Sequence, residues 1–287
     1  MEDVFEALVR IRSEGHRAAL ATIVSVSGSV PSFRAAKMLV GEDGACVGTI
    51  GGGCVEAEVI ETAREVLADE KPRTLTFDLN EDPKDDTGLV CGGSLEIFIE
   101  PVLPAAQLYV FGAGHVGLNI YRMARLAGFE VTVVDDRETY ASRERFPEAR
   151  EVLSGDLDAL LARLAPSAAA SVVIATRGHK DDMRVLRWAV HTRAAYVGML
   201  GSRRKVLTIF RNLAGEGIDP AALERVHAPV GLDIGAVTPE EIAVSVVAEL
   251  IACRRHAAAA VPGMLRARLP EAAKAGTHVF ATSPEPT

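Results

Sequence analysis

The stretch "VFGAGHVG", residues 110–117, decides the fold of the second half of this chain. It places Gly112, Gly114 and Gly117 in the order GxGxxG, with His115 inside the loop, directly after an apolar strand and at the start of a helical pattern. Such glycines allow a tight turn and the close approach of a diphosphate to a helix N-terminus. They can also serve only to pack a helix against a strand. The motif therefore leaves a nucleotide site and a purely structural βαβ unit both open.

A parallel sheet with helices on both faces is predicted around this loop. From Leu108 onward, strand and helix patterns alternate, which is typical of such sheets. The stretch "VTVVDD" brings Asp135 to the end of the next strand, where an acidic side chain can bind a ribose hydroxyl pair and favours NAD over NADP. A last helix is expected in "TPEEIAVSVVAELIACRRH", with Thr238 as its N-cap and Glu241 three residues on.

The first part of the chain is predicted to be a separate mixed α/β region. It opens with a helix, and a second helix over residues 55–70 places apolar side chains on one face. Strands are expected within residues 18–29, 37–50, 73–79 and 94–101. The proline-flanked segment over residues 100–107 is expected to be a linker.

The expected fold class is thus α/β, with an N-terminal mixed α/β domain followed by a Rossmann-like parallel-sheet domain. The two domains and a loose tail are expected over residues 1–102, 107–256 and 262–287, respectively.

Two further stretches of the second half are candidate sites. In "TRGHKDD", His179 lies near the end of a strand, where it can act as an acid or base or can cap the next helix. In "GMLGSRRK", Ser202 is expected to cap a helix whose first turn begins with Arg203 and Arg204. Cations are unfavourable at a helix N-terminus unless an anion is bound there, so the stretch predicts either an anion site or a solvated basic face.

The stretch "GTIGGGCVE" is the main candidate site of the first half, since Gly51, Gly52 and Gly53 precede Cys54. A glycine run is typical of a sharp turn or of a close approach to the main chain. Cys54 would lie in the first turn of a helix, where the helix dipole lowers the pKa of a thiol, although Glu56 and Glu58 oppose this. The alternative is a small buried cysteine behind a turn.

Cys91 repeats this arrangement, because it stands beside glycines at the end of the acidic loop "NEDPKDDTGLVCGG". The repetition suggests a shared ligand pocket. The 4 cysteines of the chain are too widely spaced for a zinc knuckle and too few for a disulfide framework, so they are expected to be reduced.

The composition limits the class of protein. The 287 residues are 48% hydrophobic and 24% charged, which is typical of a globular protein with a filled core. A net charge of -8 opposes binding to nucleic acid or anionic lipid. No run approaches the roughly 18 apolar residues that cross a bilayer, and the acidic, helical start is unlike a signal peptide. A cytoplasmic location is expected, with no nucleic acid and no membrane as partners.

Taken together, these motifs resemble the XdhC/CoxI family of accessory proteins for molybdenum hydroxylases such as xanthine dehydrogenase and aerobic carbon monoxide dehydrogenase. The stretches "GSVPSFRAAKMLV", "GTIGGGCVE" and "VCGGSLEIFIEP" resemble its N-terminal domain. The stretches "VFGAGHVG", "VTVVDDR", "ATRGHKDD", "GMLGSRRK" and "GLDIGAVTPEEIAVSVVAEL" resemble its Rossmann-like domain. The resemblance spans nearly the whole chain. It departs from the family pattern at Ser32 and Ala35, where the family usually has Arg and Gly.

The resemblance implies a chaperone rather than a metabolic enzyme. Such a protein binds molybdenum cofactor, either molybdopterin or its dinucleotide form, and protects it while a cysteine desulfurase installs the sulfido ligand. It then hands the cofactor to the apo-hydroxylase. This chemistry needs backbone donors, an anion site and a group near a soft metal, for which Cys54 is the candidate. An NAD-dependent oxidoreductase using His179 and a pure adaptor remain alternatives, and a homodimer is left open.

Overall fold

The computed structural model describes residues 2–28, 34–78 and 93–255. The chain divides into two compact units, one formed by Met1–Ala105 with Ser167–Ala169 and the other by Ala106–Pro166 with the chain from Ala170 onward. The acidic loop with Cys91, Ser32 and the tail over 262–287 lie outside the described residues. Within the described ranges, no helix is long and apolar enough to cross a membrane.

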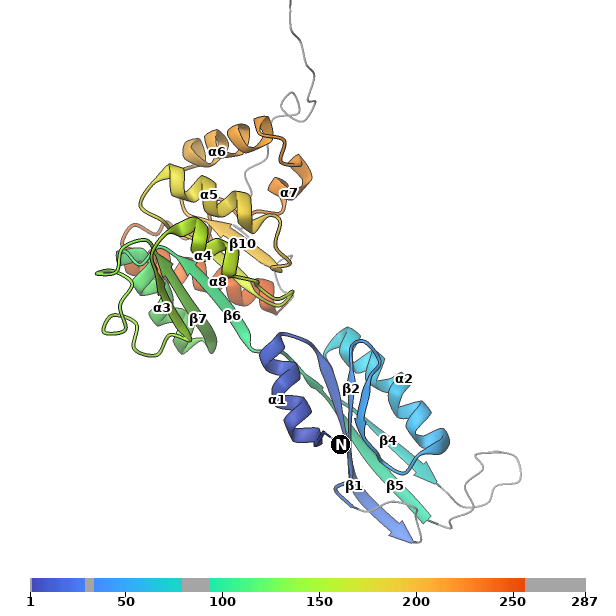
Figure 1. Cartoon of the computed structure of the whole chain (residues 1–287). Coiled ribbons are helices and arrows are strands. Elements are labelled where there is room, and N and C mark those ends of the chain that lie inside the picture. The colour runs from blue at the N-terminus through green and yellow to red at the C-terminus, as the bar shows by residue number, and fades with distance from the viewer. Residues whose placement is uncertain (1, 29–33, 79–92, 256–287) are drawn as a thin grey trace, which may run out of the picture. The chain divides into compact units, whose positions relative to one another are not determined.

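The first unit is an antiparallel sheet with a helix on each face (Figure 1). Its elements are α1 (Val4–Glu14), β1 (Ala18–Gly28), β2 (Lys37–Gly41), β3 (Cys46–Gly48), α2 (Gly53–Asp69), β4 (Arg73–Asp78) and β5 (Gly93–Val102). The strand order is β3-β2-β1-β5-β4. These elements confirm the helices and strands predicted from the sequence.

Alternation along β1 explains why both faces of this sheet are covered. Ala19, Ala21 and Ile23 point to the face that packs against α2, whereas Ala18 and Leu20 belong to the small core beside α1. Because successive side chains of a strand point to opposite faces, one apolar run supplies both cores.

The expected linker is shorter than predicted. Strand β5 continues to Val102 and β6 already begins at Ala106. Pro101 is tolerated in β5 because the pairing with β4 ends at Ile99, which leaves this end of β5 with a neighbouring strand on one side only. A proline in the sequence therefore marked the end of a strand pairing and not the end of the strand.

The second unit is a parallel sheet in the order β10-β9-β6-β7-β8, which confirms the predicted Rossmann-like fold. Its strands are β6 (Ala106–Phe111), β7 (Phe129–Asp135), β8 (Glu151–Ser154), β9 (Ser171–Ile174) and β10 (Tyr196–Met199). Its helices are α3 (His115–Leu126), α4 (Leu157–Arg163), α5 (His179–Ala189), α6 (Arg203–Gly215), α7 (Pro220–Glu224) and α8 (Pro239–Arg254). The sequence did not predict β8, α4 or α7, which are all short.

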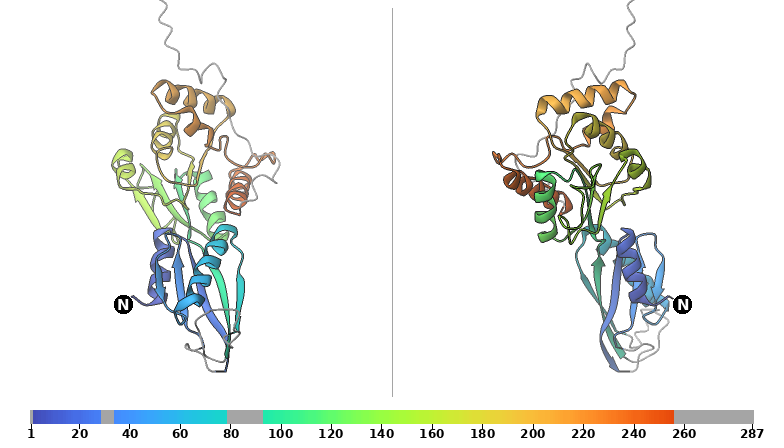
Figure 2. Two further views of the ribbon diagram at one scale, coloured as in Figure 1. Left: turned by 90° about the vertical axis from the view of Figure 1, so that its right-hand side faces the viewer. Right: turned by 60° about the vertical axis from the view of Figure 1, so that its left-hand side comes forward.

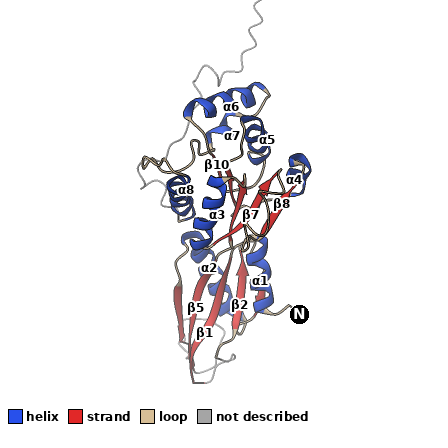
Figure 3. Cartoon of the chain, turned by 90° about the vertical axis from the view of Figure 1, so that its left-hand side faces the viewer, coloured by secondary structure: helices blue, strands red, loops and turns tan. Residues whose placement is uncertain are grey.

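Helices cover both faces of this sheet, as the alternation of patterns predicted. Helices α3 and α8 pack side by side against one face, as Figure 3 shows. Helices α4, α5, α6 and α7 share a core on the other face. The change of face between α3 and α5 follows from the strand order, because β7 lies on one side of β6 and β9 on the other.

Ala35 adopts a backbone conformation that favours glycine. Its φ is +72°, in the left-handed region, and its amide donates to the carbonyl of Ile23 at 2.9 Å. The family that this sequence resembles usually has glycine here. The departure at Ala35 is therefore a local strain in the turn that leads into β2.

We predict that Ala35→Gly stabilises the first unit. Removing the strained Cβ should raise the free energy of unfolding by about 1 kcal/mol, since the left-handed region costs about that much for a residue with a side chain. Ala57→Gly, in the exposed interior of α2, is the control and should lower it by about 1 kcal/mol. Urea unfolding followed by circular dichroism measures both, and a loss of stability in Ala35→Gly contradicts the prediction.

Candidate functional site

The candidate site of the second unit lies at the carboxyl edge of its parallel sheet. Three strands, β6, β9 and β10, each end there in a short loop that leads into α3, α5 or α6. The loops start side by side, because Ala175 N donates to Phe111 O at 2.7 Å and Leu200 N donates to Ile174 O at 2.8 Å. The chain leaves β6 and β9 toward opposite faces. This is the switch point at which open α/β sheets bind ligands.

The three glycines of the first loop have different roles. Gly112 has a φ of +115°, and a Cβ there would overlap the carbonyl oxygen of Ala175. A Cβ on Gly117 would overlap the carbonyl oxygen of Gly112, so this glycine allows α3 to contact the loop. At Gly114, in contrast, no atom lies within 4 Å of the position of a Cβ. Gly112 and Gly117 thus serve to pack the helix and the neighbouring loop against the strand, whereas Gly114 leaves open space for a ligand.

His115 and His179 occupy the same position in α3 and α5, the helices that follow the adjacent strands β6 and β9. Each is the first helical residue after a glycine N-cap, and each is exposed. The N-caps, Gly114 and Gly178, provide no side-chain hydrogen bond. The interpretation of His179 as the cap of its helix is therefore wrong, because Gly178 holds that position.

The other helices of this unit begin with side-chain caps. The capping residues are Asp156, Ser202, Asp219 and Thr238. Their side chains accept hydrogen bonds from backbone amides of the first turn, which satisfies donors that have no partner within the helix. Within the described part of this unit, α3 and α5 alone lack this feature.

Asp135 holds the glycine loop in place. One carboxylate oxygen accepts from Ala113 N at 2.7 Å, and Arg137 donates to the two oxygens from its guanidinium at 2.8 and 2.9 Å. Burial raises the pKa of Asp135, but the hydrogen bonds from Arg137 and Ala113 outweigh it and lower the pKa to about 2. A ribose at this position would have to share a carboxylate that already accepts from the protein.

The basic start of α6 is partly explained by an internal ion pair. Ser202 is the N-cap, as predicted, and accepts from Lys205 N at 3.3 Å. The ammonium of Lys205 pairs with the buried carboxylate of Asp182 in α5, so this cation needs no external anion. The side chains of Arg203 and Arg204 are exposed, and their guanidinium groups have no described hydrogen bond or ion pair. These two guanidinium groups remain the candidates for an anion.

The recess beside the glycine loop is small. It has a volume of about 20 Å³ and is lined mainly by residues at the carboxyl ends of β6 and β7 and in the loops that follow β6, β7 and β9, including Gly112 and Asp135. Such a volume accepts about one water molecule. A dinucleotide would therefore have to lie on the open edge of the sheet and not in a preformed pocket.

The candidate site of the first unit is the turn before α2. All three glycines have a positive φ, with +123° at Gly51, +78° at Gly52 and +68° at Gly53. A side chain is strained in these conformations, which explains the glycine run. Gly52 is the N-cap of α2 and Cys54 lies in its first turn.

Glu56 binds back to this turn. Its Oε1 accepts from Thr49 Oγ1 at 2.5 Å, from Ile50 N at 3.1 Å and from Gly52 N at 3.0 Å. Burial raises the pKa of Glu56, but these hydrogen bonds outweigh it and lower the pKa below its ordinary value. Within the glycine run, the amide of Gly52 is thus already bound by Glu56, and the amide of Gly51 donates to Thr49 Oγ1 at 3.2 Å.

Cys54 is exposed and is not part of a disulfide, so the alternative of a small buried cysteine is wrong. Cys91, its predicted partner in a pocket, lies outside the described residues. Among the residues that are described, no group of three His, Cys, Asp or Glu side chains could hold a metal ion. Cys54 therefore stays a single candidate thiol.

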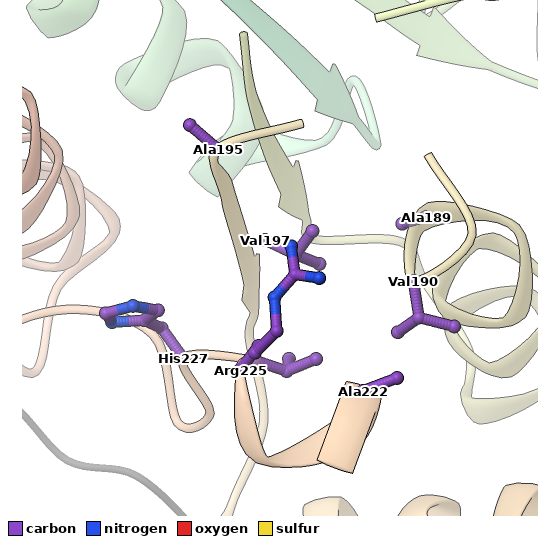
Figure 4. A pocket seen from close by; sticks show the side chains of 8 residues that line it. Ala189, Val190, Ala195, Val197, Ala222, Arg225 and His227 are labelled. Atoms are coloured by element: carbon purple, nitrogen blue, oxygen red, sulfur yellow. The ribbon is translucent and has the colours of Figure 1, made fainter. Parts of the chain in front are cut away.

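A separate cavity of about 160 Å³ lies at the amino end of β10. It is lined by Ala189, Val190, Ala195, Val197, Ala222, Arg225, Val226 and His227. Figure 4 shows the side chain of Arg225 running along β10 toward Val197, while the ring of His227 points away. None of the residues predicted from the sequence lines this cavity, which is at the opposite end of the strand from the ligand edge.

Sequence reasoning missed the carboxylates that complete both sites. Glu56 was considered only as a negative charge beside a thiol, and Asp182 was not considered. The contact of Glu56 could have been predicted from its place near the start of a helix, because acidic residues there often bind the free amides of the first turn. The pairing of Lys205 with Asp182 had no such signal, since the two residues belong to different helices.

Comparison with protein families gives two matches along the chain. Residues 108–250 match the family described as XdhC Rossmann domain, and residues 11–78 match the XdhC and CoxI family. Together the two matches cover well over half of the chain and include both candidate sites.

Three curated relatives support this assignment. The chain is 36% identical over 256 residues to the uncharacterized protein YqeB of Escherichia coli K12, covering 89% of this chain and 47% of that protein. It is 32% identical to a protein of Bacillus subtilis described as part of a probable xanthine dehydrogenase, over 56% of this chain and 47% of that protein. It is 26% identical to the molybdenum cofactor insertion chaperone PaoD of Escherichia coli K12, over 84% and 85% of the two chains. The chain thus spans about half the length of the first two relatives.

A solved structure has the same fold. A chain described as a xanthine dehydrogenase from Bacillus halodurans matches with a TM-score of 0.50 and 24% identity, covering 90% of this chain and 97% of that one. At this identity, the match supports the fold and not a particular activity.

We predict that Glu56 stabilises the first unit in a pH-dependent way. Because its pKa is lowered in the folded state, its contribution is present at neutral pH and is lost as the pH falls from about 4.5 through the folded pKa. Glu56→Gln should lower the free energy of unfolding at pH 7 by about 1 kcal/mol, since the partly exposed carboxylate is screened by solvent. The difference from wild type should shrink as the pH falls below about 4.5.

Urea unfolding between pH 7 and pH 3 measures this difference. Glu58→Gln in the same helix is the matched control, because the side chain of Glu58 is exposed and makes no described hydrogen bond. A difference between wild type and Glu56→Gln that is the same at every pH would show that the negative charge does not stabilise the turn.

Proposed function

The chain belongs to the XdhC and CoxI family, and from this we propose that it is a molybdenum cofactor insertion chaperone for a molybdenum hydroxylase of the xanthine dehydrogenase class. The observation that carries the proposal is the open backbone at Gly114, the N-cap of α3, together with the absence of a side-chain cap at the starts of α3 and α5. The similarity to PaoD over most of both chains supports the same function. The cofactor is cargo in this proposal, not a resident group.

The carboxyl edge of the second unit fits the phosphate end of such a cargo. The starts of α3 and α5 provide amide donors without a capping side chain, and a helix N-terminus favours an anion. The exposed guanidinium groups of Arg203 and Arg204 add positive charge in the first turn of α6, which follows β10, the strand next to β9. We therefore assign the phosphate or diphosphate contacts to Gly114, His115, His179 and the start of α6.

The turn before α2 gives the first unit its own candidate site. Cys54 presents an exposed thiol on a turn held by Glu56, and a thiol suits a soft metal or sulfur chemistry. We propose that Cys54 contacts the cargo or assists its sulfuration. A cysteine desulfurase and an apo-hydroxylase are the partners that this role requires.

The oxidoreductase alternative has less support in the geometry. Hydride transfer from NAD would need a closed site with a placed acid or base. The recess at the glycine loop has a volume of about 20 Å³, and the carboxylate expected to hold the ribose accepts hydrogen bonds from Arg137 and Ala113. The proposed chaperone function needs neither feature.

We predict that Gly114→Val reduces retention of the cofactor by about tenfold or more while the fold is kept. The new side chain would fill the open space at the start of α3 and separate an anion from the amides. The protein is loaded anaerobically with molybdenum cofactor released from a donor enzyme and desalted, and the bound pterin is measured by its fluorescence after oxidation.

Gly215→Val is the matched control, because this glycine of α6 also has no atom within 4 Å of its Cβ position but lies away from the ligand edge. It should retain the cofactor like wild type. Equal retention by Gly114→Val and wild type would remove the glycine loop from the proposed site.

We predict that Cys54→Ser preserves the fold but lowers activation of the client hydroxylase by about tenfold or more, because a hydroxyl is a poor ligand for a soft metal and a poor sulfur acceptor. The melting temperature should stay unchanged, since the side chain is exposed. The measurements are cofactor retention and the activity of the reconstituted hydroxylase.

Cys46→Ser is the control, since Cys46 is a second exposed thiol of the same unit, and Cys91→Ser tests the two-thiol pocket expected from the sequence. Loss with both Cys54→Ser and Cys91→Ser would support that pocket. Unchanged retention and activation with Cys54→Ser would mean that the glycine run serves only the conformation of the turn.

A further inference from the structure

The loop over residues 231–238, which leads into α8, displays apolar side chains to solvent. Ile234 is 55% exposed, Val237 is 81% exposed and Val244, in the second turn of α8, is 48% exposed. We name these three residues the loop patch. Single exposed apolar residues are common on protein surfaces, but a group of them within one short segment marks an interaction site more often.

The start of the loop is fixed to α8. The carboxylate of Glu249, which is 0% exposed, accepts from Gly231 N and is also bonded to the ring of His227. Ser245 Oγ donates to Leu232 O at 2.7 Å. There is no room for a side chain at Gly231, since a Cβ would overlap Ser245 Oγ. These contacts hold the beginning of the loop in one conformation.

The end of the loop is fixed as well. The carboxylate of Glu241 accepts from Val237 N at 2.8 Å and from Thr238 N at 3.0 Å, and the side chain of Thr238 caps α8 in return. Ile234 and Val237 are therefore exposed on a loop held at both ends. A surface that is already ordered loses little conformational entropy when a partner binds.

The loop patch lies beside the candidate cofactor site of the same unit. Val230, just before the loop, donates to Met199 O at the carboxyl end of β10. In the first turn of α8, Glu240 accepts from Asn119 of α3 at 2.9 Å. The loop thus belongs to the edge of the sheet at which α3 begins. In the views of Figure 2, the segment before α8 projects outward from this unit.

Two acidic residues stand close to the loop patch in the sequence. Asp233 and Glu240 are exposed beside it, and Asp233 makes no described hydrogen bond or ion pair. A protein that receives an anionic cofactor needs positive charge at the entrance to its own site, because a phosphate is bound by cations. Two exposed carboxylates beside apolar side chains are complementary to such an entrance.

We propose that the loop patch is the surface on which the apo-hydroxylase docks, with the basic rim of its cofactor entrance facing Asp233 and Glu240. The inference rests on the proposed chaperone function. It adds the place of contact, which would bring the entrance of the recipient next to Gly114 during transfer.

The test uses the full chain with the apo-forms of the molybdenum hydroxylases of the same organism. Ile234→Ser combined with Val237→Ser should weaken binding to the recipient by about tenfold or more in biolayer interferometry, in keeping with the loss of apolar contacts at the centre of an interface. Asp233→Lys should weaken binding most at low salt, because rim charges act at long range. Both variants should retain molybdenum cofactor like wild type.

Leu126→Ser is the matched control. Leu126 is 85% exposed at the last residue of α3, at the opposite end of that helix from the glycine loop, and this variant should bind the recipient normally. If the loop variants bind the recipient as well as wild type does, the proposed docking surface is wrong. If they also lose self-association, the loop patch contacts a second copy of the chain instead. If wild type retains no cofactor, the proposed function itself fails. If it retains cofactor but its loop variants transfer it normally, only the docking surface fails.

Discussion

The close contact between Gly117 and Gly112 is the constraint on which the second unit depends. No Cβ fits at either position, so α3 can approach the end of β6 and the loop after β9 at van der Waals distance. Asp135 then holds the same loop through the amide of Ala113. Since the three parallel strands end together, this contact fixes the edge at which the candidate ligand groups meet.

Carboxylates of the protein itself occupy several of the positions that an external anion could take. Glu56 binds the amides of the turn before α2, Asp182 pairs with Lys205 at the start of α6, and Glu241 closes the start of α8. Free backbone amides at a helix start are costly unless they are solvated or paired. The uncapped starts of α3 and α5 therefore indicate a ligand more specifically than the glycines alone do.

The proposed transfer of a cofactor sets two opposing requirements on this edge. The cargo must be bound firmly enough to be protected, yet it must be accessible to a second protein. A recess of about 20 Å³ beside the glycine loop is consistent with a ligand held on an open surface. The anchored loop before α8 offers the recipient an ordered contact next to that surface. An enzyme that excludes water from its substrate would need the opposite arrangement.

The sequence by itself determined the periodicity of the elements, the parallel order implied by alternating strands and helices, and the caps at Ser202 and Thr238, because these features depend on residues a few positions apart. It also determined the need for glycine at residues 51–53, where every φ is positive. Tertiary structure alone decided which donors remain available. The carboxylate of Asp135 meets an amide 22 residues away, and Lys205 meets Asp182 on another helix. Such contacts are set by the path of the backbone in space, and no local pattern encodes them.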